Sequence, residues 1–203
     1  MLPDMSELQI ETLRGIQVSA HLAPLAQLRI EVFRDWPYLY QGSLEYERNY
    51  LKTYAQCERS LIVLVREGER CVGASTALPL SDAEPAMQAP FLESGMPVAD
   101  ISYFGESLVL PAWRGRGLGV KFFELREAHA LILGLSLCTF CAVSRPDDHP
   151  MRPAGYVPND AFWQRRGYSP VPDMQAHYEW TDLDQQQATS KPMQFWSRRL
   201  SLS

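Results

Sequence analysis

The stretch from residue 103 to residue 130 constrains the fold more than any other part of the sequence. It reads YFGESLVLPAWRGRGLGVKFFELREAHA: an apolar run, a glycine-rich turn, and a segment with helical periodicity. This order predicts a strand, a loop and a helix. Glycines leave backbone N–H groups open to a ligand, and the first turn of a helix presents unpaired N–H groups at the positive end of its dipole. The turn therefore predicts a pyrophosphate-binding site.

The spacing of the glycines separates this turn from other phosphate-binding patterns. Position 120 is valine, so a G-x-G-x-x-G pattern starting at Gly115 is broken, and no G-x-x-x-x-G-K-[ST] pattern occurs. The remaining pattern is R-x-x-G-x-G at Arg114, Gly117 and Gly119. In its setting between an apolar strand and an amphipathic helix, it resembles the acetyl-CoA-binding motif of the GNAT superfamily of N-acetyltransferases.

The order of the other elements extends this resemblance over most of the chain. Hydrophobic patterns predict strands at residues 8–13, 61–65, 71–78, 135–143, 175–181 and 192–200, and helices at about 23–33, 44–56 and 159–166. The resemblance implies an α/β (α+β) fold with a mixed, mostly antiparallel central sheet of about six to seven strands. It also implies helices on both faces of the sheet and a splay between the two central strands.

The length of 203 residues fits a single domain, and we expect residues 1–203 to form one GNAT-like acyltransferase domain. Residues 80–99 are the least typical part. They contain Pro85, Pro90 and Pro97 among small and acidic residues, which argues against a long helix. We interpret this stretch as an insertion or a lid.

Composition and charge exclude several classes of partner. The net charge is −5 and the basic residues are scattered, so we expect no binding to nucleic acid. No apolar run approaches the roughly 20 residues that span a bilayer, so we expect no membrane partner. Four cysteines and a start without a signal-like segment indicate a cytoplasmic protein. Cys138 and Cys141 would point to opposite faces of a strand, so we expect no metal site.

By resemblance to GNAT enzymes, the strand and the glycine loop share the binding of acetyl-CoA. The strand at residues 108–110 would bind the pantetheine arm through its backbone, and the N–H groups of residues 115–119 would bind the pyrophosphate. Arg114 and Arg116 either add positive charge or are simply solvated. Trp163 packs against the arm of the cofactor or against the core. The predicted acetyl-CoA-binding residues are Leu108, Val109, Leu110, Arg114, Gly115, Arg116, Gly117, Leu118, Gly119 and Trp163.

Glu106 is the first candidate for a catalytic base. It interrupts an otherwise apolar strand, and simple alternation places it on one face with Phe104, Leu108 and Leu110. A carboxylate in this position could accept a proton from an ammonium, directly or through water. The structural alternative is a carboxylate held by an arginine or by a backbone N–H.

The general acid is harder to assign. By resemblance, GNAT enzymes commonly place a proton-donating tyrosine four residues before the glycine of the last motif. That glycine is Gly167 here, and the position is occupied by Trp163. Tyr156 could donate the proton to the departing thiolate instead, although an aromatic-rich chain also uses tyrosines for packing.

The proline-rich loop at residues 145–158 follows the predicted central strand, at the strand end where sites of α/β proteins are usually built. His149 is the second candidate base because it could deprotonate an amine, and Asp148 could bind the positive charge of the amine. Alternatively, both residues serve only in turns.

The aromatic loop between the first two helices is the expected acceptor site. Trp36 and Tyr38, with Asp35 beside them, could enclose a cationic amine through cation–π and Coulomb attraction. Alternatively, this loop only holds the two helices together.

These features predict a GNAT-type, acyl-CoA-dependent N-acetyltransferase. It would transfer an acetyl group from acetyl-CoA directly to a primary amine, with a small-molecule acceptor favoured over a protein and without a metal ion. Trp163 at the usual donor position leaves open a non-catalytic CoA-binding sensor or regulatory module. A homodimer is expected only because many GNAT proteins dimerise and the terminal strands offer edges for pairing.

Overall fold

The computed structural model describes residues 8–201. The strands are β1 (Leu8–Leu13), β2 (Leu61–Glu67), β3 (Arg70–Pro79), β4 (Ile101–Val109), β5 (Leu137–Val143), β6 (Ser169–Trp180) and β7 (Thr189–Arg199). The α-helices are α1 (Leu22–Phe33), α2 (Leu44–Gln56), α3 (Pro85–Glu93), α4 (Leu118–Ile132) and α5 (Asp160–Arg165). Short 3₁₀ helices lie at Gly15–His21, Leu80–Asp82, Val98–Asp100 and Pro111–Trp113.

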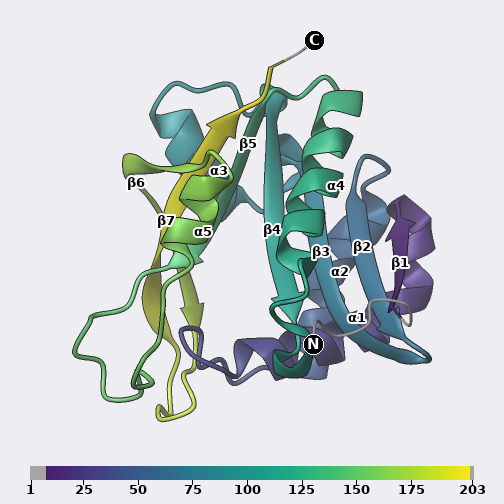
Figure 1. The fold of residues 1–203 in the computed structure, drawn as a ribbon. Helices are drawn as coiled ribbons and strands as arrows, with labels where there is room; N and C mark the ends of the chain where they lie inside the picture. The colour runs from purple at the N-terminus through teal and green to yellow at the C-terminus, as the bar shows by residue number, and fades with distance from the viewer. Residues whose placement is uncertain (1–7, 202–203) are drawn as a thin grey trace.

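The seven strands form one sheet in the order β1-β2-β3-β4-β5-β7-β6 (Figure 1). β4 and β5 pair in parallel, and every other neighbouring pair is antiparallel. The mixed, mostly antiparallel sheet predicted from the sequence is therefore confirmed. The strands predicted at residues 61–65 and 71–78 form the antiparallel pair β2 and β3, and Gly68 in the turn between them has a left-handed backbone with φ +57°.

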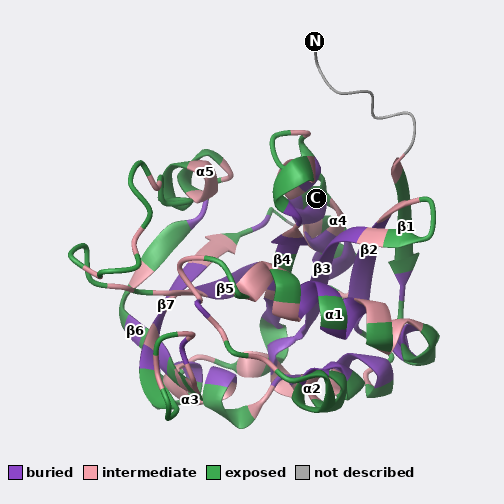
Figure 2. Cartoon of the chain, turned by 90° about the horizontal axis from the view of Figure 1, so that it is seen from below, coloured by how far each residue is buried: buried purple, intermediate pink, exposed green. Residues whose placement is uncertain are grey.

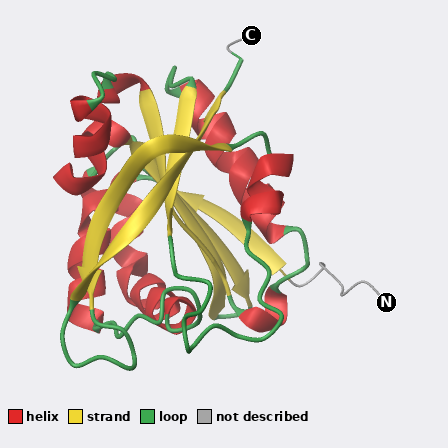
Figure 3. Ribbon diagram, turned by 90° about the vertical axis from the view of Figure 1, so that its left-hand side faces the viewer, coloured by secondary structure: helices red, strands yellow, loops and turns green. Residues whose placement is uncertain are grey.

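The two central strands, β4 and β5, pair over only their first residues. Their register runs from Ile101 opposite Leu137 to Tyr103 opposite Thr139 and then stops, although both strands continue. Beyond this point β4 continues to pair with β3, so the backbone groups on its other side lack a strand partner within residues 8–201. Figure 3 shows the two halves of the sheet diverging. The predicted splay is therefore confirmed.

A β-bulge in β4 lies beside this splay. Ser75 of β3 pairs with Ser107, but Ala77 pairs with Phe104, so β4 carries one extra residue between the two pairs. Gly105 lies inside the bulge, where an added Cβ would come within 2.1 Å of the hydroxyl of Tyr54. The bulge therefore requires glycine at position 105.

The bulge also changes which side chains share a face of β4. Phe104 packs against Phe123 of α4, with ring centroids 6.0 Å apart, whereas Glu106 contacts Arg29 of α1. The prediction that Glu106 shares a face with Phe104 is therefore wrong. The extra residue shifts the alternation by one position, which turns the following side chains to the opposite face.

Helices cover both faces of the sheet, as predicted (Figure 3). On one face, Phe123 of α4 packs against Phe162 of α5 and Phe140 of β5. On the other face, α1 packs against β3, β4 and α2. Figure 2 shows that buried residues concentrate on the central strands and on the inner sides of the longer helices, whereas α5 and the loops are largely exposed.

The stretch at residues 80–99 contains the helix α3, which we did not predict because of the three prolines in this stretch. Pro85 lies in the first turn of α3, where its missing N–H removes no helical hydrogen bond. Phe91 of α3 is buried and packs edge-on against Phe195 of β7, with ring centroids 4.9 Å apart. The helix thus contributes to the hydrophobic core, and the interpretation of the stretch as an insertion or a lid stays a prediction.

The two terminal strands begin earlier than the sequence predicts, at residue 169 instead of 175 and at residue 189 instead of 192. The register of β6 against β7 shifts between Pro170 and Gln175. This irregularity interrupts the alternation of apolar and polar residues, so the first part of β6 has no visible strand pattern.

Candidate active site

A cleft of about 900 Å³ lies where β4 and β5 separate. The glycine loop and the start of α4 line part of it, and the loop between α1 and α2 lines another part together with residues that follow β5, which we call the acceptor end. Glu106 and Trp163 also face this cleft. One continuous space therefore joins the predicted phosphate-binding loop, the predicted base and the predicted acceptor loop.

The glycine loop has a backbone that glycine adopts far more readily than other residues. Gly115 has φ +76° and Gly117 has φ +80°, both in the left-handed region. No described atom lies within 4 Å of a Cβ built at either position, so the space beside the loop is open. Gly117 directly precedes the 15-residue helix α4, whose first N–H groups lack intrahelical partners. The loop therefore has the geometry of an anion site.

The other residues predicted to bind acetyl-CoA divide into two groups. Arg114 donates from Nε to the Val109 carbonyl at 3.0 Å and forms an exposed ion pair with Asp35 at 3.6 Å. The predicted residues that line the cleft are Val109, Arg114, Gly115, Gly117, Leu118, Gly119 and Trp163. Those outside the lining are Leu108, Leu110 and Arg116, of which the two leucines are buried in the core.

Glu106 lines the cleft and is held from the side of α1. It is 5% exposed, forms an ion pair with Arg29 and accepts a hydrogen bond from the Thr76 hydroxyl. Arg29 also binds Glu47 of α2, and its guanidinium lies 4.2 Å from the ring centroid of Tyr50. The geometry matches the structural alternative of a carboxylate held by an arginine, while one side of Glu106 still faces the cleft.

Arg29 stays charged in this cluster. Burial alone would lower its pKa, but the nearby Glu106, Tyr50 and Glu47 outweigh burial and raise the pKa well above the ordinary value. The cluster therefore consists of one permanent cation between two carboxylates, assembled from α1, α2 and β4.

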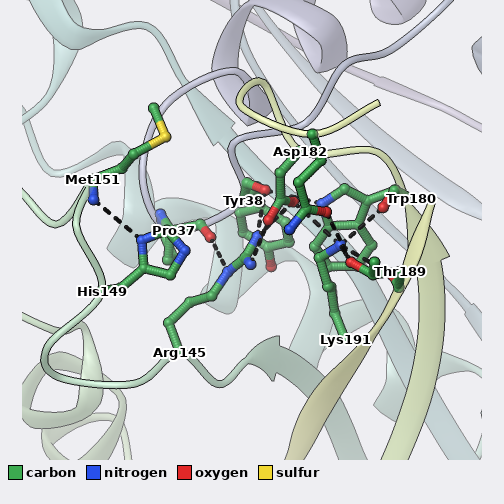
Figure 4. Close-up of polar contacts among 10 residues, drawn as sticks. Pro37, Tyr38, Arg145, His149, Met151, Trp180, Asp182, Thr189 and Lys191 are labelled. Carbon is green, nitrogen blue, oxygen red and sulfur yellow. Dashed lines mark hydrogen bonds and ion pairs between the residues drawn. The ribbon is translucent and has the colours of Figure 1, made fainter. Parts of the chain in front are cut away.

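A buried arginine joins the two rims of the acceptor end (Figure 4). Arg145 donates to the carbonyl oxygens of Pro37 and Tyr38, each at 2.8 Å, and to both carboxylate oxygens of Asp182, at 2.7 and 2.9 Å. Lys191 lies 3.4 Å from Asp182. We call Arg145, Asp182 and Lys191 the Arg145 clamp. It ties the loop between α1 and α2 to the hairpin of β6 and β7.

The sequence and the fold differ in how far they resemble known proteins. No protein-family model matches the sequence, and no curated protein matches it. Solved structures do match. A GCN5-related N-acetyltransferase from Kribbella flavida is 14% identical, with a TM-score of 0.56 over 97% of this chain and 100% of the other. A ribosomal-protein-alanine N-acetyltransferase from Brucella melitensis is 13% identical, with a TM-score of 0.60 over 95% and 99%.

A third solved structure is a protein from Salmonella typhimurium, determined with its cofactor acetyl-CoA. It is 11% identical, with a TM-score of 0.56 over 97% of this chain and 96% of the other. The chain has the GNAT fold. The resemblance stated from the glycine loop is thereby confirmed at the level of the fold.

Trp163 stands at the position where the GNAT resemblance implies a proton-donating tyrosine. It lines the cleft and packs edge-on against Phe140 and Trp196, with ring centroids 5.1 Å apart in both pairs. An indole N–H donates hydrogen bonds but supplies no acid comparable with a phenol. Trp163 is therefore a wall of the cleft.

Tyr156, the substitute donor, lines the cleft on the acceptor side. Its ring meets that of Trp36 edge-on, with centroids 5.9 Å apart. Burial and, to a lesser extent, Asp160 raise the pKa of Tyr156, so its hydroxyl stays protonated at neutral pH. Tyr156 can therefore donate a hydrogen bond to a molecule bound in the cleft.

The remaining predicted residues surround the acceptor end unevenly. Trp36 and Tyr38 line the cleft, whereas His149 and Asp148 do not. The His149 ring packs 5.0 Å from that of Trp36, and its Nδ1 accepts a hydrogen bond from the Met151 N–H at 3.2 Å (Figure 4). His149 therefore lies against Trp36 but outside the cleft lining, and Asp148 is exposed on its loop.

Sequence reasoning missed three arginines of the site: Arg29, which binds Glu106, and Arg126 and Arg145, which line the cleft. Arg126 of α4 lines the cleft and is 2% exposed. The available signal is its spacing four residues after Phe122, which places a cation on the sheet-facing side of an amphipathic helix. Arg145 carried no local signal, because its partners lie far away in the sequence.

Within residues 8–201, no group of three or more His, Cys, Asp or Glu side chains is arranged to hold a metal ion. In the same part of the chain, none of the helices combines the length and the apolar character needed to cross a membrane.

Proposed function

We propose that this chain is an N-acetyltransferase that transfers an acetyl group from acetyl-CoA directly to the primary amine of a small molecule. One observation carries the proposal: the cleft between β4 and β5 connects the open glycine loop with the carboxylate of Glu106. We further propose that residues 1–203 act as one catalytic domain.

The residues of the cleft fit acetyl-CoA. The unpaired N–H groups of the glycine loop and of the first turn of α4 would hold the pyrophosphate. The free edge of β4 near Val109 would hold the pantetheine arm through backbone hydrogen bonds, beside Trp163. When bound, acetyl-CoA supplies an acetyl group activated as a thioester. The Salmonella typhimurium protein solved with acetyl-CoA supports this fit.

Glu106 would accept the proton that the amine loses. Arg29 and the Thr76 hydroxyl bind the carboxylate and fix its direction, so little reorganisation is needed when the amine arrives. His149, which packs against Trp36 outside the cleft lining, would be the second candidate base, and Tyr156 would direct its hydroxyl toward the reacting groups.

The acceptor end of the cleft supports a small molecule over a protein. Trp36 and Tyr38 would enclose the organic part of the amine between aromatic rings. The Arg145 clamp bridges the two rims of this end, which restricts the space for a loop of a folded protein. Asp35 forms an ion pair with Arg114 outside this end and would act at its entrance.

The second candidate is a CoA-binding module without catalytic activity. Two observations favour it: an indole, that of Trp163, stands at the usual position of the proton donor, and Glu106 is already bound by Arg29. Both candidates share the cofactor site and differ in turnover.

The test combines calorimetry with acetyl-CoA and an assay of free CoA thiol across a panel of primary amines. The proposed enzyme binds acetyl-CoA and releases thiol faster with at least one amine than without any amine. Binding without amine-dependent release from any member of the panel would support the module instead. Absence of acetyl-CoA binding would contradict both candidates. Light scattering on the same sample tests the predicted homodimer.

A further inference from the structure

Arg126 is the most deeply buried arginine of the described chain and has no part in the proposed binding of the pyrophosphate or in proton removal from the amine. The other buried guanidiniums are balanced by carboxylates, since Arg29 binds Glu47 and Glu106 and Arg145 binds Asp182. Among residues 8–201, no carboxylate lies within ion-pair distance of Arg126. A buried cation without a counter-ion is costly, so its position in the lining of a cleft points to an anionic partner.

The guanidinium of Arg126 lies at the bulge of β4, where the splay begins. It donates from Nη1 to the Glu106 carbonyl at 3.1 Å, from Nη2 to the Ser107 hydroxyl at 2.9 Å, and from Nε to the Phe122 carbonyl at 3.2 Å. Its central carbon lies 4.4 Å from the ring centroid of Phe104. These hydrogen bonds do not use all the N–H groups of a guanidinium, and the residue lines the cleft.

The pyrophosphate is too far away to be that anionic partner. Arg126 follows Leu118, the first residue of α4, by eight positions. At the helical rise per residue this places it about 12 Å farther along the axis than the anion site of the glycine loop. It therefore lies toward the narrow end of the splay, where a chain bound along β4 from the loop inward would place its terminal sulfur.

We propose that Arg126 stabilises the thiolate that leaves when the acetyl group is transferred, an inference that rests on the proposed function. The amine nitrogen forms a bond to the thioester carbon, the carbon–sulfur bond breaks, and the electron pair of that bond stays on sulfur. The proton lost by the amine goes to Glu106 and then to solvent. The guanidinium keeps its own protons, and the thiolate is protonated by water after release.

This role fits the tryptophan at the usual donor position. Trp163 supplies no acidic hydroxyl at the usual donor position, and a positive charge on Arg126 lets the sulfur leave as an anion without a proton donor there. A thiolate can leave in this way because thiols are much stronger acids than alcohols, and a fixed positive charge in a buried site stabilises the anion further. Burial lowers the pKa of Arg126 to about 10, which still leaves it charged at neutral pH.

The test is a titration of the CoA thiol bound to the protein, followed by the ultraviolet absorbance of the thiolate. The protein's own cysteines interfere little, because burial raises the pKa of Cys57 to about 11 and the pKa values of Cys138 and Cys141 to about 12. Burial also raises the pKa of Cys71. The difference spectrum with and without CoA therefore reports the bound thiol.

We expect the bound thiol of the unmodified protein to have a pKa below that of free CoA. In Arg126→Gln this pKa rises by about 1–3 units, the usual effect of removing an opposite charge at close range. Arg126→Lys keeps most of the lowering. The matched control is Arg198→Gln, because Arg198 binds Glu127 of α4, the residue after Arg126, at 3.0 Å but does not line the cleft. We expect Arg198→Gln to leave the thiol pKa unchanged.

The proposal is overturned if the bound thiol of the unmodified protein has the pKa of free CoA or a higher one, a result that needs no folded variant. It is also overturned if folded Arg126→Gln binds CoA with an unchanged thiol pKa. Because the titration uses CoA without an amine, it succeeds or fails independently of the acetyl-transfer assay. A lowered thiol pKa in a protein without turnover would preserve the role of Arg126 as a thiolate site and reject the proposed function.

Discussion

The guanidinium of Arg29 on α1 holds the carboxylate of Glu106 on β4 across the interface between helix and sheet. The same guanidinium binds Glu47 of α2, so three elements meet at one cation. The bulge in β4 makes this contact possible by turning Glu106 toward α1. The candidate base is therefore positioned by the tertiary fold as well as by its place in the strand.

Replacing Glu106 with glutamine should lower kcat/KM for acetyl transfer by about 100-fold or more, because a positioned general base contributes about 10²–10⁴-fold. Steady-state release of CoA thiol measures this change. Glu127→Gln is the matched control, since Glu127 also binds an arginine and a hydroxyl, Arg198 and Tyr168, but does not line the cleft. An unchanged rate and pH profile in Glu106→Gln would remove Glu106 from the mechanism.

Replacing Gly117 with alanine should raise the dissociation constant of CoA by at least about tenfold, because a Cβ would enter the space beside the anion site and strain the left-handed backbone. Isothermal calorimetry measures the constant. Gly95→Ala is the control: Gly95 has φ +75° and an equally open surrounding, but lies away from the cleft. Equal losses of affinity in both variants would assign the effect to backbone strain alone.

Replacing Gly105 with alanine should destabilise the protein by about 1–3 kcal/mol, the usual cost of overpacking. The new Cβ would lie 2.1 Å from the Tyr54 hydroxyl and 2.5 Å from that of Thr76. Denaturant unfolding measures the loss. Combining Gly105→Ala with Tyr54→Phe should recover part of it because one of the two clashing oxygens is removed. No recovery in the double variant would argue against the bulge geometry.

Replacing Asp182 with asparagine should destabilise the protein at pH 7 by about 3–5 kcal/mol, since it leaves Arg145 and Lys191 buried without their carboxylate. Burial alone would raise the pKa of Asp182, but the two cations outweigh burial and lower it. Its contribution to stability is therefore present above the unfolded pKa near 3.9 and is lost as the pH falls through the lower folded value.

Unfolding free energies of Asp182→Asn and of the unmodified protein should accordingly converge as the pH falls below about 4. Asp147→Asn serves as the control, because Asp147 forms an ion pair with Arg152 but its side chain is 96% exposed, so its removal changes stability little. A constant difference between the two proteins from pH 7 to pH 3 would contradict the role of the Arg145 clamp.

Local signals were sufficient to predict the framework of this site. The glycine loop predicted the strand, turn and helix because left-handed glycines and helix periodicity are properties of adjacent residues. The splay was implied by the family resemblance, and the structure confirms it in the short register of β4 with β5. The helix at 85–93 was missed because proline is tolerated in a first turn and the pattern at Pro90 argued against continuation.

The parts of the site that depend on distant partners could not be read from the sequence. Alternation misplaced Glu106 relative to Phe104, since a single extra residue in the bulge reverses the faces. Arg29 meets Glu106 from a position 77 residues away in the sequence. The spacing of Arg126 places it on the sheet-facing side of its helix, but its contacts with Glu106 and Ser107 depend on how β4 packs against that helix.

The most direct test of the central claim is mass spectrometry of a panel of primary amines incubated with the protein and acetyl-CoA. We expect an acetylated product from at least one amine, formed in proportion to protein concentration and strongly reduced with Glu106→Gln. Tight binding of acetyl-CoA with no acetylated amine anywhere in the panel would contradict it.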